Sequence, residues 1–225
     1  MKRLSITIIL LLSGFAFFSS CDNGGSDDGI TTWVKAYGTA AGFEAYPFKI
    51  IPTIDGGFVL LGSLNDIVKL DGEGVLQWQK SFNDSLEAFY LESIAETAEG
   101  DLVVAGRGGY DTDILLKLDK DGNELWEKGC SGLGVAEWYL IDVDKTTGSI
   151  YLLYALGEFS VVMKKDAAGN VLWNKKFDVQ YGRPFYSIRA TTDGGCIVAQ
   201  SIYIATDETS GASYPVAIKV NAGGA

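Results

Sequence analysis

The residues best suited to chemistry gather in Lys117–Trp126, where two aspartates, an asparagine and two lysines stand beside a tryptophan. Carboxylate and amide oxygens at this spacing are what a calcium-binding loop offers. Such a loop places its glycine sixth, however, and Gly122 is fourth when counted from Asp119. The copy at Asp166–Asn170 also lacks the second acidic residue. The stretch therefore predicts a polar turn between two strands, with no metal and no cofactor.

The chain of 225 residues contains no histidine. Histidine is the usual general base, the commonest zinc ligand and a member of the Ser-His-Asp triad. The net charge of −11 also opposes binding to nucleic acid, which needs clustered cations. We therefore expect a protein that is not an enzyme and does not bind nucleic acid.

The chain is built from an internal repeat with a period of about 47 residues. Three markers share this period: a tryptophan, a Lys-x-Asp or Lys-x-Asn element, and a turn centred on glycine. The tryptophans are separated by 45, 48 and 47 residues, and they are Trp33, Trp78, Trp126 and Trp173. Three independent markers with one period indicate a repeat architecture, in which each unit packs on its neighbours.

Each repeat contains four strand signals. The tryptophan strand tends to alternate apolar and polar residues, as in Leu76–Phe82, which is typical of a half-exposed strand. The strand after the glycine turn is a nearly continuous apolar run, such as Leu102–Gly106, as expected for a strand buried on both faces. Four antiparallel strands every 40 to 50 residues predict an all-β fold, a β-propeller of four-stranded blades over residues 31–225. A β-sandwich is the alternative, but it would not require the same turn and tryptophan in every unit.

Four repeat units are present, and two arrangements are open to them. The chain begins with the strand of Trp33 and ends after Lys219, so the first strand could complete the last blade beside Val216–Val220 and hide both edges. Alternatively, the units form an open arc or part of a larger ring. We favour the second arrangement, because the chain stops inside a turn before the next expected tryptophan.

The stretch Lys117–Lys128 resembles the repeat of the pyrroloquinoline-quinone-type propellers, whose blades end in an aspartate, a glycine-containing turn and a strand that carries a tryptophan. Leu70–Trp78 and Lys165–Trp173 match the same pattern. The resemblance implies a propeller in which these tryptophans dock between neighbouring blades. It covers the structural repeat alone, since the adjacent cysteine pair typical near that cofactor is absent. The turn aspartates are expected to hydrogen-bond turn backbone, and they are Asp71, Asp119 and Asp166.

Residues 1–20 have the features of a signal peptide. Lys2-Arg3 is a positive start, and Leu4–Phe18 is an apolar run too short to span a bilayer comfortably. Phe18-Ser19-Ser20-Cys21 then resembles a bacterial lipobox, although leucine is usual at its first position. The match implies acylation of Cys21, a flexible acidic tether over residues 21–30, and export to the outer membrane or cell surface of a Gram-negative envelope. The alternative is an ordinary secretory signal followed by a chance cysteine.

Two further cysteines, Cys130 and Cys196, lie in different repeats and have no counterparts in the others. A disulfide between them is open in an oxidising compartment, but we favour two separate cysteines. Cys196 lies in an apolar strand and is expected in the core.

Together these observations predict an envelope lipoprotein that acts as a non-catalytic protein-binding or scaffold propeller, with a membrane and a protein as its partners. The alternative is a glycan-binding module of the cell surface, in which loop aromatics stack on sugars. The candidate ligand-loop residues are Trp138, Tyr139 and Tyr110. A propeller enzyme is the third alternative, and the missing histidine argues against it. Ligands are expected where the repeats differ, in the loops 107–112, 129–139 and 203–214.

Overall fold

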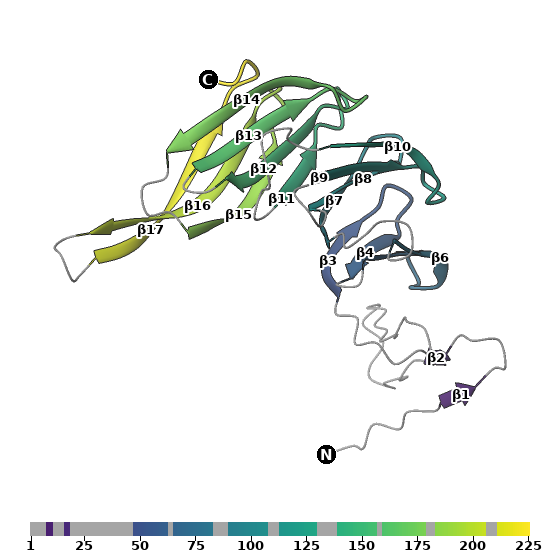
Figure 1. The fold of residues 1–225 in the computed structure, drawn as a ribbon. Coiled ribbons are helices and arrows are strands. Elements are labelled where there is room, and N and C mark those ends of the chain that lie inside the picture. Colours follow the sequence, from purple (N-terminus) through teal and green to yellow (C-terminus); the bar gives the residue numbers. More distant parts are fainter. Residues whose placement is uncertain are drawn as a thin grey trace, which may run out of the picture.

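The computed structural model describes residues 8–10, 16–18, 47–62, 65–82, 90–107, 113–129, 139–156, 159–178, 183–205 and 211–225 (Figure 1). Every regular element in these ranges is a β-strand. No described segment forms a helix long and apolar enough to cross a membrane. The first two strands, β1 (Ile8–Leu10) and β2 (Ala16–Phe18), pair only with each other. The all-β prediction is therefore confirmed.

The first two blades are four-stranded antiparallel sheets in which each strand pairs with the next along the chain. The first blade contains β3 (Pro47–Pro52), β4 (Phe58–Gly62), β5 (Asp66–Leu70) and β6 (Leu76–Ser81). The second contains β7 (Tyr90–Glu96), β8 (Leu102–Arg107), β9 (Asp113–Leu118) and β10 (Glu124–Lys128). Short turns over residues 53–57, 71–75, 97–101 and 119–123 join β3 to β4, β5 to β6, β7 to β8 and β9 to β10, as the repeat predicts.

The last two blades repeat this order. The third contains β11 (Tyr139–Val143), β12 (Ile150–Leu156), β13 (Phe159–Lys165) and β14 (Val171–Asp178). The fourth contains β15 (Arg183–Ala190), β16 (Cys196–Ala205) and β17 (Gly211–Val220), three strands within the described ranges. The predicted propeller with four repeat units is therefore confirmed.

The hydrophobic core consists of three clusters, one between each pair of successive blades. Strand β8 shows how one strand contributes to two of them. Leu102 and Val104 pack toward the first blade, whereas Val103 and Ala105 pack toward the third. All four side chains are 1% exposed or less. The continuous apolar run of this strand follows, because both faces of a central blade are covered by neighbours.

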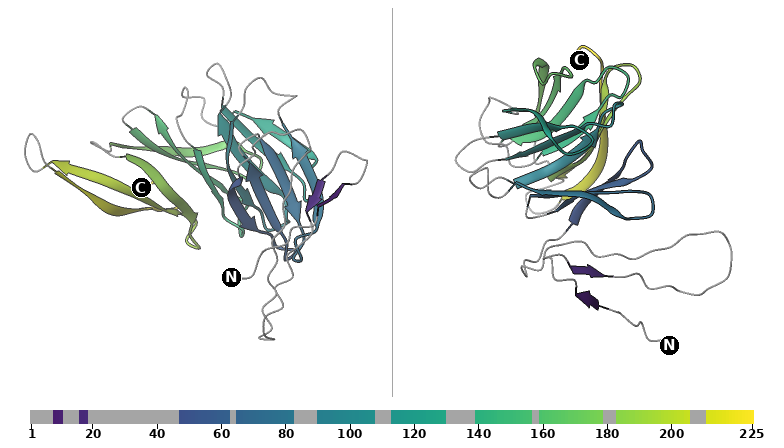
Figure 2. Two further views of the ribbon diagram at one scale, coloured as in Figure 1. Left: turned by 90° about the horizontal axis from the view of Figure 1, so that it is seen from below. Right: turned by 90° about the vertical axis from the view of Figure 1, so that its right-hand side faces the viewer.

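The blades converge on their first strands. β7 contacts β3 in the preceding blade and β11 in the following blade, and β11 also contacts β15. The first blade and the fourth lie at opposite ends of this row, with no extended contact between their described strands (Figures 1 and 2). The described blades thus form an arc, with the first strands on its inner side.

Candidate functional site

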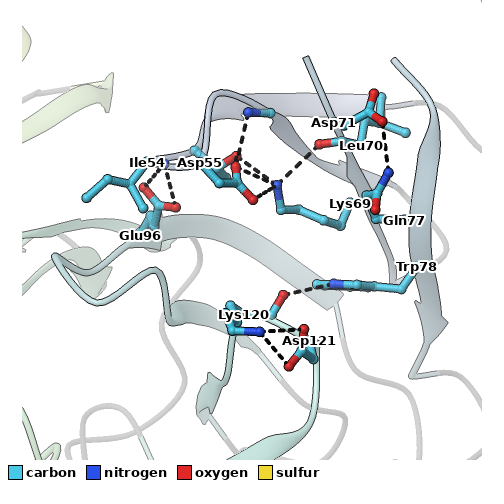
Figure 3. Close-up of polar contacts among 12 residues, drawn as sticks. Ile54, Asp55, Lys69, Leu70, Asp71, Gln77, Trp78, Glu96, Lys120 and Asp121 are labelled. Atoms are coloured by element: carbon cyan, nitrogen blue, oxygen red, sulfur yellow. Dashed lines mark hydrogen bonds and ion pairs between the residues drawn. The ribbon is translucent and has the colours of Figure 1, made fainter. Parts of the chain in front are cut away.

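Each of the first three blades contacts the next through the tryptophan of its outer strand. Trp78 on β6 donates its indole N–H to the carbonyl oxygen of Lys120 in the second blade at 3.0 Å (Figure 3). Its ring covers Gly122, whose φ is +79° and whose added Cβ would lie 3.2 Å from the ring carbons. Trp126 covers Gly169 and Trp173 covers Gly224 in the same manner.

The turns under these rings are capped by the aspartate that opens them. Oδ1 of Asp119 accepts the backbone N–H groups of Asp121 and Asn123 at 2.9 and 2.7 Å, and Oδ2 accepts the Asn123 amide at 3.0 Å. The hydrogen bond from the Asn123 side-chain amide, together with those from the two backbone N–H groups, holds the pKa of Asp119 below its usual value. The equivalent side chains make the same backbone bonds, and they are Asp71, Asp166 and Asn221.

A second turn in the first blade is clamped by a lysine from the third strand. The buried Lys69 Nζ lies 2.8 Å from Asp55 Oδ2 and 2.9 Å from Thr53 Oγ1 (Figure 3). Hydrogen bonding to Lys69, and secondly to Thr53, lowers the pKa of Asp55 to about 2. The fourth blade repeats the clamp with Lys219, Asp193 and Thr191. Among the described residues, no group of three acidic or sulfur side chains could hold a metal ion.

Glu96, at the end of β7, connects three blades. Its two carboxylate oxygens accept the backbone N–H of Ile54 in the first blade at 2.9 and 3.0 Å (Figure 3). Oε2 also lies 3.1 Å from Nζ of Lys145 in the third blade. The Glu96 side chain is only 4% exposed, so these partners replace water around the carboxylate.

On the inner side of the arc, side chains of one blade bind the free strand edge of the next. The first strand of each sheet has no neighbouring strand on its inner edge, and its backbone N–H groups still need acceptors. Glu92 accepts Tyr139 N at 2.7 Å, Ser93 accepts Ile141 N at 3.1 Å, and Asp142 accepts Ala190 N at 2.7 Å. These polar side chains therefore fix the spacing between inner strands.

Four of the side chains on the inner strands form what we call the axial cluster: Lys49, Ser93, Asp142 and Arg189, one from each blade. Lys49 Nζ donates to Ser93 Oγ at 2.7 Å, and a guanidinium nitrogen of Arg189 lies 3.7 Å from Asp142 Oδ1. Burial, and secondly the charge of Arg189, lower the pKa of Lys49 to about 8, while the charge of Asp142 opposes this change. The cluster thus gathers two cations and one carboxylate, a set suited to binding charge.

Replacing Lys49 by methionine should raise the free energy of unfolding at pH 7 by about 1–2 kcal/mol, because it removes a partly buried cation. The pKa of about 8 in the folded protein lies below the usual lysine value of 10.5. Between these values the unfolded chain still holds a proton that the folded protein has released, so wild-type stability rises with pH in this window. Urea denaturation from pH 6.5 to 10 should show that the difference in free energy of unfolding between Lys49→Met and wild type becomes smaller as the pH rises. The exposed Lys175, changed to methionine, is the control, and a gap independent of pH would contradict the assignment.

The face of the fourth blade that points away from the third is not covered by any other described strand. Paired residues of β16 and β17 lie on this face together, for example Ala199 opposite Ala217 and Ser201 opposite Pro215. With Tyr186, which is 65% exposed, they border a groove of about 500 Å³. We call this surface the open face. Its remaining described lining residues are Gln200, Ser213 and Val216, so the described part of the lining carries no charge.

The structure corrects one of the candidate ligand-loop residues. Tyr139 is 1% exposed and packs against Tyr154 in the core between the second and third blades, so its ring cannot stack on a sugar. Cys196 is a buried free thiol, and burial raises its pKa to about 11. The other predicted positions lie outside the described residues, and they are Cys21, Trp33, Tyr110, Cys130 and Trp138.

Neither the axial cluster nor the open face was predicted from the sequence. The sequence does contain a signal for the cluster. When the repeats are aligned on their glycine turns, Lys49 and Ser93 occupy equivalent positions, and so do Asp142 and Arg189. These are polar departures in strands that are otherwise largely apolar. The open face leaves no such signal, since its small and apolar residues resemble those of a covered strand.

No protein-family model matches the chain, and no curated protein sequence matches it. Among solved structures it resembles a protein of unknown function from Bacteroides caccae, with 17% identity and a TM-score of 0.52 over 80% of this chain. It also resembles the WD40 domain of coronin from Toxoplasma gondii, with 13% identity and a TM-score of 0.55 over 96% of this chain. A eukaryotic initiation factor matches with 10% identity and a TM-score of 0.53 over 98% of this chain.

These likenesses show the fold alone, because the identities are low. WD40 domains are β-propellers, which agrees with the blades described above. The chain spans 62%, 57% and 50% of the three matched chains, in the order given.

Proposed function

We propose that this protein is a non-catalytic binding or scaffold protein of the cell envelope, held to a membrane by a lipid on Cys21. The observation that carries the proposal is the open face of the fourth blade. It combines an exposed tyrosine ring with small, uncharged residues on a rigid sheet, next to a groove of about 500 Å³. Exposed apolar surfaces of this kind mark interaction sites in soluble domains.

The chemistry of the open face favours a protein partner that presents apolar side chains. The described lining carries no charged group that could select a charged peptide or a phosphate. Tyr186 supplies the large ring that protein interfaces use as an anchor, and the alanines and serines leave room for side chains of the partner. The hairpin of β16 and β17 projects beyond the blades (Figure 2). Its exposed Ile204 and Tyr214 lie on the opposite face of the hairpin from Ser201 and Pro215, so they are not part of the open face.

Photo-crosslinking in cells tests this proposal. A benzoylphenylalanine in place of Tyr186 should give discrete adducts with a protein of the envelope. The matched control is the same group at Leu172, an apolar side chain that is 55% exposed on the outer strand of the third blade. A Cys21→Ser chain with the probe at residue 186 should lose most of the adduct, because it is no longer held at the membrane. Equal adducts at residues 172 and 186, or none at 186, would contradict a partner at this face.

A glycan is the second candidate ligand, and the exposed ring of Tyr186 beside Ser201 and Ser213 is what favours it. Sugars bind by stacking on such rings while hydroxyl groups supply hydrogen bonds. A glycan array would separate the two proposals: saturable binding that Tyr186→Ala abolishes supports a glycan, whereas a blank array leaves the protein partner.

A further inference from the structure

The axial cluster holds more positive than negative charge. Its charged members are Lys49 on β3, Asp142 on β11 and Arg189 on β15, contributed by three different blades. In the chain as a whole acidic residues dominate, with a net charge of −11. A local excess of cations in an acidic protein is therefore a specific feature of this place and not a property of the surface as a whole.

The partners of the two cations leave donors available. Lys49 Nζ donates to the neutral Ser93 Oγ, and no carboxylate of the described chain forms a salt bridge with it. The contact of Arg189 with Asp142 is loose at 3.7 Å, and its side chain is 69% exposed. The other oxygen of Asp142 is already occupied by the Ala190 N–H. The single carboxylate of Asp142 thus does not neutralise the charges of both Lys49 and Arg189.

Burial and the nearby Arg189 both act against the charge on Lys49, as its lowered pKa reflects. An oxyanion placed between the two side chains would reverse this penalty. A guanidinium binds carboxylate or phosphate oxygens through paired N–H donors, and an ammonium adds a compact charge beside it.

We propose that the axial cluster is a binding site for a small molecule carrying a carboxylate or phosphate group, held between Lys49 and Arg189. The site shares no residue with the groove of the open face and goes beyond the proposed protein-binding function. The hydroxyl of Ser93 accepts from Lys49, and Asp142 lies beside the guanidinium of Arg189 while it accepts the Ala190 N–H of β15.

Calorimetric titration of the full chain with inorganic phosphate and with succinate tests the site, at low ionic strength so that screening is weak. At least one of the two probes should bind saturably. Lys49→Met and Arg189→Gln should each weaken that binding by about ten-fold or more, the value of one charge-assisted hydrogen bond. Lys175→Met, an exposed cation on the outer strand β14, should bind as wild type does.

The two probes separate the sources of the oxyanion. Binding of phosphate alone identifies a phosphorylated ligand class, and binding of succinate alone identifies a carboxylic acid. The proposal is overturned if neither probe binds saturably, or if Lys49→Met and Arg189→Gln both bind as tightly as wild type. Arg189 is largely exposed, so Arg189→Gln reports on binding even where a change at Lys49 alters folding.

Discussion

Replacing Glu96 by alanine is expected to lower the free energy of unfolding by about 3 kcal/mol. The substitution removes both acceptors of the Ile54 N–H and the only carboxylate that forms a salt bridge with Lys145 among the described residues. It also leaves a cavity where a 4% exposed side chain stood. Guanidinium denaturation followed by tryptophan fluorescence would measure the loss.

The position of Glu96 gives this change a second signature. A stack of blades is stabilised by contacts between neighbours, and Glu96 links the first, second and third blades at one point. Its loss should uncouple the first blade, so the unfolding transition should broaden as well as shift. Glu96→Gln, which keeps an acceptor for Ile54, should lose less stability than Glu96→Ala.

The matched control is Asp121→Ala, which breaks the ion pair between Lys120 and Asp121. Both partners are largely exposed, at 69% and 65%, and such surface pairs contribute little. A Glu96→Ala loss no greater than that of Asp121→Ala would show that the buried carboxylate does not couple the blades.

Much of the fold could be predicted because local sequence patterns determine its strands and turns. The spacing of Trp78, Trp126 and Trp173 and the apolar run at Leu102 depend on strand period and turn chemistry, which neighbouring residues determine. A strand buried on both faces needs apolar residues throughout, so the pattern also predicts that blades stack. The docking of each tryptophan between blades was implied by the resemblance of the repeat, and the structure shows it for Trp78 on the turn of Gly122.

The candidate sites could not be predicted in the same way, because they depend on which blades meet. Tyr139 was assigned to a loop that binds ligands, yet the structure buries its ring against Tyr154, since β11 begins at that residue. The axial cluster links Lys49 to Arg189, 140 residues away in sequence, through contacts of Ser93 and Asp142, which no local pattern encodes. The open face differs from the other blade faces only because no other described strand covers it.

Replacing Gly57 by alanine is expected to lower the free energy of unfolding by about 4 kcal/mol or more, because overpacking against rigid backbone cannot relax cheaply. A Cβ on Gly57 would lie 2.1 Å from the carbonyl oxygen of Leu70 and 2.7 Å from Lys69 Nζ. The strands would have to separate, and the clamp between Lys69 and Asp55 would open with them.

A substitution at the adjacent Gly56 tests whether the cost at Gly57 comes from the close approach or from the backbone conformation of the turn. Gly56 has φ of +83° but no atom within 4 Å of an added Cβ, so Gly56→Ala should cost only about 1–2 kcal/mol. The second blade shows why the close approach is specific to the clamp: Asp101 stands at the level of Gly57 there and itself pairs with Lys117 at 2.9 Å. Thermal unfolding of both alanine variants would decide the matter. Equal losses would mean that turn conformation alone, and not the approach of Lys69 and Leu70, requires the paired glycines.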